Sequence, residues 1–102
     1  MFFVLGFYKF KKLKLLKKNK FLLQNFFKEH NIRGTLIISK EGLNATLSGK
    51  LANISFINRK IKSLFKIKNF DSENLSKNNF QPFHRFKIKI KREVVPMGLN
   101  IL

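Results

Sequence analysis

The chain has 102 residues, and its 22 Lys and Arg residues against 5 Asp and Glu residues produce a formal net charge of +17. This length predicts one domain with a modest core, for which 13 Phe residues provide bulky side chains. The absence of cysteine excludes disulfides, a Cys-based zinc site and a thiol nucleophile. The charge favours a polyanionic partner, nucleic acid or an anionic membrane surface, with Lys-rich codon usage as the competing explanation.

The first segment, residues 2–10, is rich in Phe and predicts a strand that is buried on much of both faces. Lysines follow this apolar run instead of preceding it, which is the reverse of the order in a signal peptide. No stretch approaches the roughly 20 apolar residues of a membrane-spanning helix. These features predict a cytoplasmic protein without a membrane segment.

Two amphipathic helices are expected. Residues 13–30 place apolar side chains on one arc and lysines opposite, with Phe21 pointing outward. A second helix is expected to begin near Asn53 as its N-cap. The predicted core side chains of the first helix are Leu15, Leu16, Leu22, Leu23, Phe26 and Phe27, and those of the second are Ile54, Ile57, Ile61, Leu64 and Phe65.

Between the helices, residues 34–49 read GTLIISKEGLNATLSG. Two short apolar runs flank residues 41–44, where Gly42 and Asn44 tolerate positive φ, so the pattern predicts strand, tight turn and strand. In one interpretation Glu41 and Asn44 only shape this turn. In the other they present a carboxylate and an amide that contact substrate RNA or another domain.

Near the end, residues 69–79 are polar and predict a strand plus a loop, while residues 86–91 alternate strictly between apolar side chains and lysines. This alternation predicts a half-buried strand with side chains about 7 Å apart on its solvent face, a spacing suited to a phosphate backbone. The nucleic-acid-binding candidates are Arg85, Lys87, Lys89 and Lys91. An ordinary solvated strand face is the alternative.

The order of these elements is β-α-β-β-α-β with an extra strand or loop near the end. It predicts an α+β, ferredoxin-like sandwich in which two helices cover one face of an antiparallel sheet.

The sequence contains no group of residues spaced for metal binding, cofactor binding or catalysis. His30 and His84 are far apart and the acids form no cluster, so no metal site is expected. Phosphate-binding glycine loops are also missing, and we expect no cofactor and no catalytic residue. Tyr8 and Phe21 are the candidates for stacking on bases, although a structural role is the favoured explanation for each of them.

Three segments together resemble a known family: Phe7-Tyr8-Lys9-Phe10, the 34–49 hairpin, and residues 82–91 with Glu93-Val94-Val95. They are similar to the N-terminal domain of the rhodanese-like tRNA uridine hydroxylases, which hydroxylate the wobble uridine of certain tRNAs. The resemblance implies a ferredoxin-like domain over residues 1–98 and a connector from residue 99. It also implies tRNA as a partner, and a separate rhodanese-domain chain as a second one. The family's reactive Cys belongs to the rhodanese domain and has no counterpart here, so the hydroxylation is assigned to no residue of this chain.

A tRNA-positioning domain is therefore the expected function, and three alternatives stay open. An acylphosphatase-like enzyme would need an Arg in a phosphate loop after the first strand. Lys11-Lys12 stand there instead, although Asn44 could supply the required Asn. A membrane-surface module would use the Lys-rich first helix. The third alternative is a gene fragment without independent function.

Overall fold

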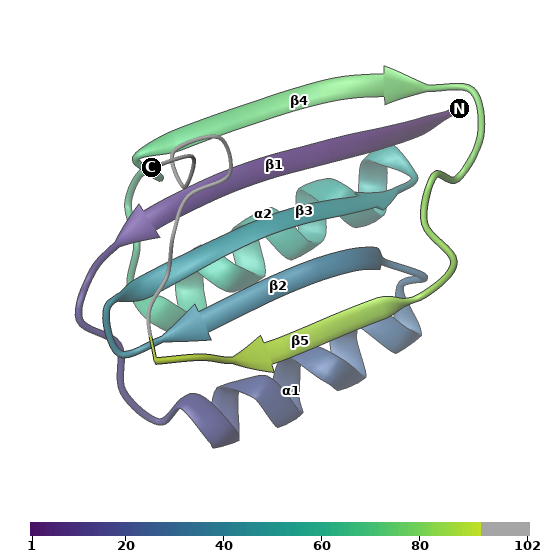
Figure 1. The fold of residues 1–102 in the computed structure, drawn as a ribbon. Coiled ribbons are helices and arrows are strands. Elements are labelled where there is room, and N and C mark those ends of the chain that lie inside the picture. Colours follow the sequence, from purple (N-terminus) through teal and green to yellow (C-terminus); the bar gives the residue numbers. More distant parts are fainter. Residues whose placement is uncertain (93–102) are drawn as a thin grey trace.

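The computed structural model describes residues 1–92. The expected connector from residue 99, and residues 93–95 of the family resemblance, lie outside this range. The elements in chain order are β1 (Phe2–Phe10), α1 (Leu16–Glu29), β2 (Arg33–Ser39), β3 (Gly42–Gly49), α2 (Leu51–Phe65), β4 (Ser72–Asn78) and β5 (Phe86–Ile90) (Figure 1).

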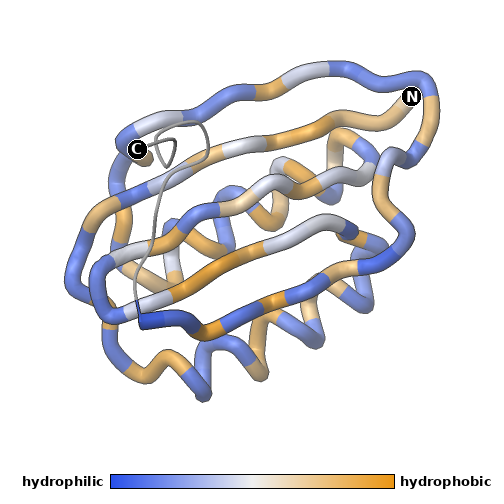
Figure 2. The backbone as a smooth tube through the Cα atoms, viewed as in Figure 1, coloured by the Kyte–Doolittle hydropathy of each residue, from blue (hydrophilic) through white to orange (hydrophobic). Residues whose placement is uncertain are grey.

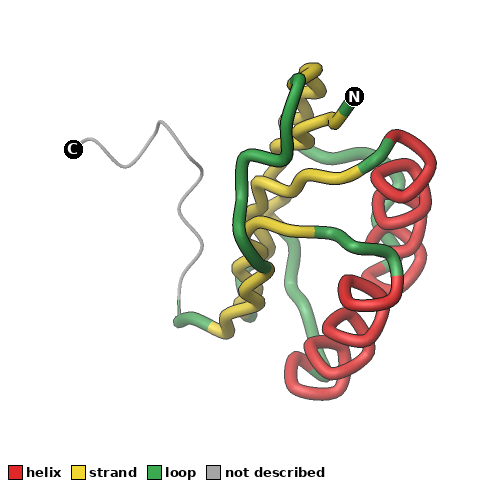
Figure 3. The backbone as a smooth tube through the Cα atoms, turned by 90° about the vertical axis from the view of Figure 1, so that its right-hand side faces the viewer, coloured by secondary structure: helices red, strands yellow, loops and turns green. Residues whose placement is uncertain are grey.

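The strands form one five-stranded sheet in the order β4-β1-β3-β2-β5. The β2–β5 pair is parallel and the other pairs are antiparallel, so the sheet is mixed. Both helices pack on one face and the opposite face is open (Figure 3). This arrangement is the predicted ferredoxin-like α+β sandwich.

The strand that extends the four-stranded ferredoxin-like sheet is β5. The polar segment Ser72–Asn78 forms β4 beside β1, with Leu75 opposite Leu5, and thereby completes the four-stranded unit. In contrast, β5 adds to the other edge by parallel pairing with β2, so that Ile88 lies opposite Leu36. The sequence of β4 carries almost no hydrophobic pattern (Figure 2), because this edge strand is exposed along its length.

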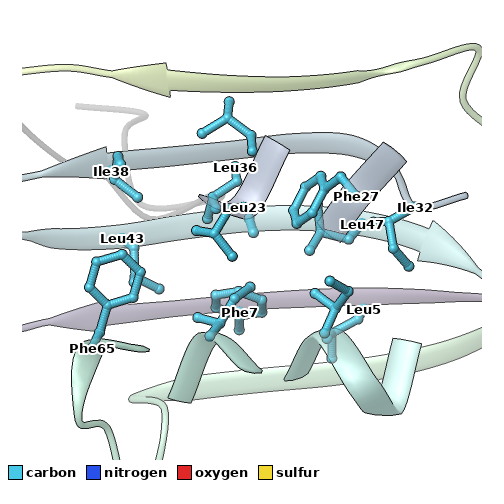
Figure 4. Packing of buried hydrophobic residues seen from close by; sticks show 14 of the residues in the cluster. Leu5, Phe7, Leu23, Phe27, Ile32, Leu36, Ile38, Leu43, Leu47 and Phe65 are labelled. Carbon is cyan, nitrogen blue, oxygen red and sulfur yellow. The ribbon is translucent and has the colours of Figure 1, made fainter. Parts of the chain in front are cut away.

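The core lies between the sheet and the two helices (Figure 4). Leu23 and Phe27 of α1 are fully buried, as the helical periodicity predicts, and Phe21 points outward with 64% of its surface exposed. From the sheet, alternate residues of each central strand face the helices. The side chains that bury completely or nearly so in these strands are Leu5, Phe7, Leu36, Ile38, Leu43, Ala45 and Leu47.

The start of α1 differs from the prediction. The helix begins at Leu16, three residues later than expected, and Leu15 is its N-cap with φ 55° and ψ 44°. The amides of Lys11 and Leu13 donate to the carbonyls of Glu41 and Lys40, which ties this segment to the β2–β3 turn before the helix can begin. Leu15 is consequently 66% exposed, and its assignment to the core was wrong.

The start of α2 also differs, because its N-cap is Lys50 and not Asn53. Strand β3 continues until Gly49, which lies opposite Phe3 of β1, so only Lys50 links the strand to the helix. Asn53 therefore lies inside the first turn. The predicted buried face is confirmed, since Ile54, Ile57, Ile61 and Phe65 are all buried.

The tight turn of the hairpin consists of Lys40 and Glu41, with Ser39 paired opposite Gly42. The Glu41 amide donates to Ser39 Oγ at 3.0 Å. Gly42 has φ +152°, and a Cβ there would overlap the Lys9 carbonyl oxygen of the neighbouring strand, so this position requires glycine. Asn44 lies within β3 and not in the turn, which corrects the expectation that it adopts a left-handed conformation there.

Candidate nucleic-acid interface

A line of basic side chains follows the β5 edge of the sheet. Phe86, Ile88 and Ile90 lie opposite residues of β2 that face the helices, so Lys87 and Lys89 project from the open face. Arg85 and Lys91 directly precede and follow the strand, and the Lys91 amide extends the pairing by donating to the Ile38 carbonyl at 2.9 Å. The four predicted residues Arg85, Lys87, Lys89 and Lys91, here named the basic stripe, are all exposed.

Beyond the stripe, Arg92 is exposed and follows the end of β5. Arg92 follows Lys91 directly and so departs from the alternation of apolar and basic residues, but it places no charge in the core because the strand has already ended.

A fifth positive charge joins this face from the neighbouring strand. Arg33 opens β2 opposite Ser48, and its Nη1 donates to the Phe83 carbonyl at 3.3 Å. This bond fixes the connection that leads into β5 against the end of the sheet. Sequence reasoning missed Arg33, although the alternation with buried Leu36 and Ile38 would have placed it on the open face.

Two acidic residues, Asp71 and Glu73, lie at the opposite edge of the sheet. Lys9 pairs with Asp71 at 3.2 Å and Lys62 pairs with Glu73 at 3.7 Å, both near the β4 edge. Across residues 1–92 no ion pair involves the basic stripe. Among the described residues its charge is therefore not paired with a carboxylate, which favours an anionic ligand.

The Asp71 carboxylate has a structural role at that opposite edge. Its Oδ2 accepts a hydrogen bond of 2.7 Å from the Phe10 amide, and Oδ1 accepts one of 3.2 Å from Lys9 Nζ. The backbone hydrogen bond, assisted by the Lys9 charge, lowers the pKa of Asp71 below its ordinary value of 3.8. Asp71 thus fastens the start of β4 to the end of β1.

The open face between these two edges is polar and shallow. One row crosses all five strands, because the pairings join Ser72, Tyr8, Asn44, Ile37 and Lys89 in that order. A depression of about 290 Å³ lies over Gly6 and beside Tyr8. The sheet therefore offers a polar surface that runs directly into the basic stripe.

The other predicted site residues separate in space. Asn44 is buried within this row, whereas Glu41 is exposed in the β2–β3 turn. Tyr8 lies on the open face, half-buried and edge-to-face with Phe10, with ring centroids 5.7 Å apart. Phe21 projects from α1, which covers the opposite face, so one flat ligand cannot contact both aromatic rings.

The two histidines stay apart. His30 packs its ring on Phe56 at 4.3 Å, while His84 is exposed beside Arg85. In the described part of the chain no three His, Cys, Asp or Glu side chains come together as metal ligands. Within the same residues, no helix is long and apolar enough to cross a membrane.

The acylphosphatase-like alternative gains no residue from the structure. The connection between β1 and α1 covers residues 11–15 and contains lysines and leucines but no arginine. Asn44 lies on the open face, away from the helix layer.

These features define a ferredoxin-like domain of the acylphosphatase-like type, with a basic edge on an open sheet. Residues 2–94 match the family model described as the UPF0176 acylphosphatase like domain, and the chain belongs to this family. It is 60% identical over 101 residues to a tRNA uridine(34) hydroxylase of Pelagibacter ubique, covering 99% of this chain and 34% of that protein. A tRNA uridine(34) hydroxylase of Bartonella bacilliformis is 36% identical over 101 residues, covering 97% of this chain and 32% of the relative.

The chain therefore spans about a third of the length of these relatives. Solved structures agree on the fold alone. An acylphosphatase from Bacillus subtilis superposes with a TM-score of 0.58 at 10% identity, covering 89% of this chain and 99% of the other. A bacterial light-regulated adenylyl cyclase superposes with a TM-score of 0.67 at 14% identity, covering 88% of this chain and 28% of the other.

Proposed function

We propose that the chain binds and positions tRNA as the N-terminal domain of a tRNA uridine-34 hydroxylase. The observation that carries this proposal is the basic stripe, which is exposed, free of ion pairs within residues 1–92, and continuous with an open polar sheet face. The family relationship supports tRNA as the polyanion, because the relatives are tRNA uridine(34) hydroxylases.

The geometry suits contacts with the phosphate backbone. Side chains two residues apart on a strand lie about 7 Å apart, close to the separation of successive phosphates in an extended strand. Lysines and arginines at this spacing neutralise phosphates and fix the orientation of the RNA without reading its sequence. The stripe would thus hold the tRNA in register, while base selection and chemistry fall to other groups.

We assign the hydroxylation itself to the portion of the relatives that lies outside this chain. A rhodanese-domain polypeptide, covalently joined or separate, is the proposed second partner. The cytoplasm, where tRNA is abundant, is the proposed location. On this proposal the purified chain alone shows neither hydroxylase nor sulfurtransferase turnover, which an assay with thiosulfate and cyanide against a buffer control would check.

Binding of an unmodified tRNA transcript, followed by fluorescence anisotropy over a range of salt concentrations, tests the proposal. The test variant changes Lys87, Lys89 and Lys91 to Gln. We expect weaker binding. The slope of log Kd against the logarithm of the salt concentration should fall by up to about three, which is about one for each lost phosphate contact.

The matched control removes the same number of charges from the first helix and its N-terminal connection by changing Lys14, Lys17 and Lys18, all exposed, to Gln. Both variants reduce long-range attraction equally, so only local contacts distinguish them. Equal losses would show that net charge alone binds tRNA and that the stripe is no site. A larger loss in the control would move the site to α1.

A further inference from the structure

A wide groove lies away from the open face. It is bounded by the connection into α1, the β2–β3 turn and the end of β5, three segments that meet at one end of the molecule (Figure 1). Its volume is about 900 Å³, near the upper end of the range for binding sites in proteins. The aliphatic side chains of Leu13, Leu15, Leu16 and Ile90 line it.

Two of these aliphatic side chains are exposed to an extent that folding does not explain. Leu15 is 66% exposed and Ile90 is 38% exposed. Leu15 also adopts the left-handed conformation, φ 55°, which is unfavourable for a leucine. Large apolar side chains that remain on the surface in strained backbone are typical of binding sites.

The conformation of Leu15 is held in place by the buried Asn19. The Asn19 amide donates to the Leu15 carbonyl at 2.9 Å, and its side-chain Nδ2 donates to the Lys14 carbonyl at 3.3 Å. The segment is therefore fixed on both sides of Leu15 before any partner arrives. Such preorganisation reduces the entropy that a partner must lose on binding.

The rim of the groove is strongly basic. Five exposed lysines surround the aliphatic floor and Glu41 is the single acid among the lining residues. The lysines come from both sides, with Lys40 in the β2–β3 turn and the others on or before α1. They are Lys12, Lys14, Lys17, Lys18 and Lys40.

This combination selects the kind of partner. The floor has no aromatic side chain, so it offers no platform for stacking an RNA base. A second copy of this chain, with its own charge of +17, would be repelled. A partner would complement the aliphatic floor with aliphatic side chains and the lysine rim with carboxylates on either side of them. An amphipathic acidic helix presents them in this arrangement, because its charged residues border the apolar stripe on both sides.

We propose that this groove binds an acidic amphipathic helix of a partner polypeptide, with Leu15 and Ile90 as its central contacts. The surface is separate from the basic stripe, because Ile90 faces the helix side of the sheet while Lys87 and Lys89 project from the open face. The inference consequently holds or fails independently of tRNA binding.

The probe is a fluorescein-labelled synthetic 18-residue peptide with Leu at positions i, i+3, i+4 and i+7 of each two turns and Glu or Gln elsewhere. We expect the full 102-residue chain to bind it at about 0.15 M salt at least about tenfold more tightly than a scrambled peptide of the same composition. Leu15→Gln and Ile90→Gln should each weaken binding by about tenfold, as expected for an anchor residue. Phe21→Gln, on the helix that follows Leu15 and as exposed as Leu15 but outside the groove, should leave binding unchanged.

Because Leu15, Ile90 and Phe21 are all exposed, the three variants should retain the melting temperature of the parent within a few degrees. Equal binding of the scrambled peptide would show attraction by charge alone and overturn the proposal. Unchanged binding by Leu15→Gln would do the same. Co-sedimentation with phosphatidylserine vesicles that depends on Leu15, without peptide binding, would overturn the proposal and show that the groove binds a membrane surface. Self-association that depends on Leu15, measured by sedimentation equilibrium, would overturn it as well and show that the groove binds a second copy of this chain.

Discussion

Truncation of Phe27 to Ala measures how firmly α1 is held on the sheet. Phe27 is fully buried, and its ring meets Phe86 of β5 edge-to-face with centroids 5.7 Å apart. Removal of a buried Phe side chain costs about 3–5 kcal/mol, of which about 0.5–1.5 kcal/mol is the aromatic pair. For a domain of this size that corresponds to a melting temperature lower by about 12 °C or more.

The control is Phe21→Ala, the same substitution six residues earlier on the same helix, where the ring is 64% exposed. We expect it to change the free energy of unfolding by less than about 0.5 kcal/mol. Urea unfolding followed by far-UV circular dichroism provides both values. Comparable destabilisation by the two substitutions would mean that α1 is rotated about its axis and that Phe27 does not face the sheet.

Three further substitutions test individual features. Gly42→Ala should destabilise the domain by at least about 1–3 kcal/mol because of its φ and the overlap with the Lys9 carbonyl; an unaltered urea midpoint would contradict the β1–β3 register. Since the pKa of Asp71 is lowered, its carboxylate stabilises the fold above pH 3.8 and this contribution is lost as the pH falls further. The difference in melting temperature between the parent and Asp71→Asn should therefore shrink below that pH, and a constant difference would refute the role of the carboxylate. Leu15→Gly relieves left-handed strain and should raise the free energy of unfolding by up to about 1 kcal/mol while it abolishes peptide binding in the groove; a marked loss of stability would show that Leu15 contributes to the core.

Much of the fold could be predicted because side-chain periodicity is a local property. The alternation of Phe86, Ile88 and Ile90 with lysines specified which face of β5 is buried, and the spacing of Leu23 and Phe27 specified the buried side of α1. The burial of Ile88, Leu23 and Phe27 confirms both patterns, while Ile90 at the end of β5 stays 38% exposed. The basic stripe was identifiable for the same reason, although its role in binding stays a prediction.

Element boundaries were less predictable, because hydrogen bonds to distant segments decide them. Leu15 continues the apolar pattern of α1, yet the bonds from residues 11 and 13 to the β2–β3 turn delay the helix and leave Leu15 outside the core. Asn44 has the residue type of a turn, but pairing with Tyr8 and Ile37 places it in the middle of a strand. Local propensity yields to tertiary pairing at both positions.

The sequence by itself determined the order of helices and strands, the faces that they bury and the family to which the hairpin belongs. Only the tertiary structure decided that β5 adds in parallel to β2, that Arg33 joins the basic edge, and that Leu13, Leu15, Leu16 and Ile90 converge in one groove. The physical reason is that sheet order and groove formation depend on contacts between segments far apart in the chain. No window of neighbouring residues contains those contacts.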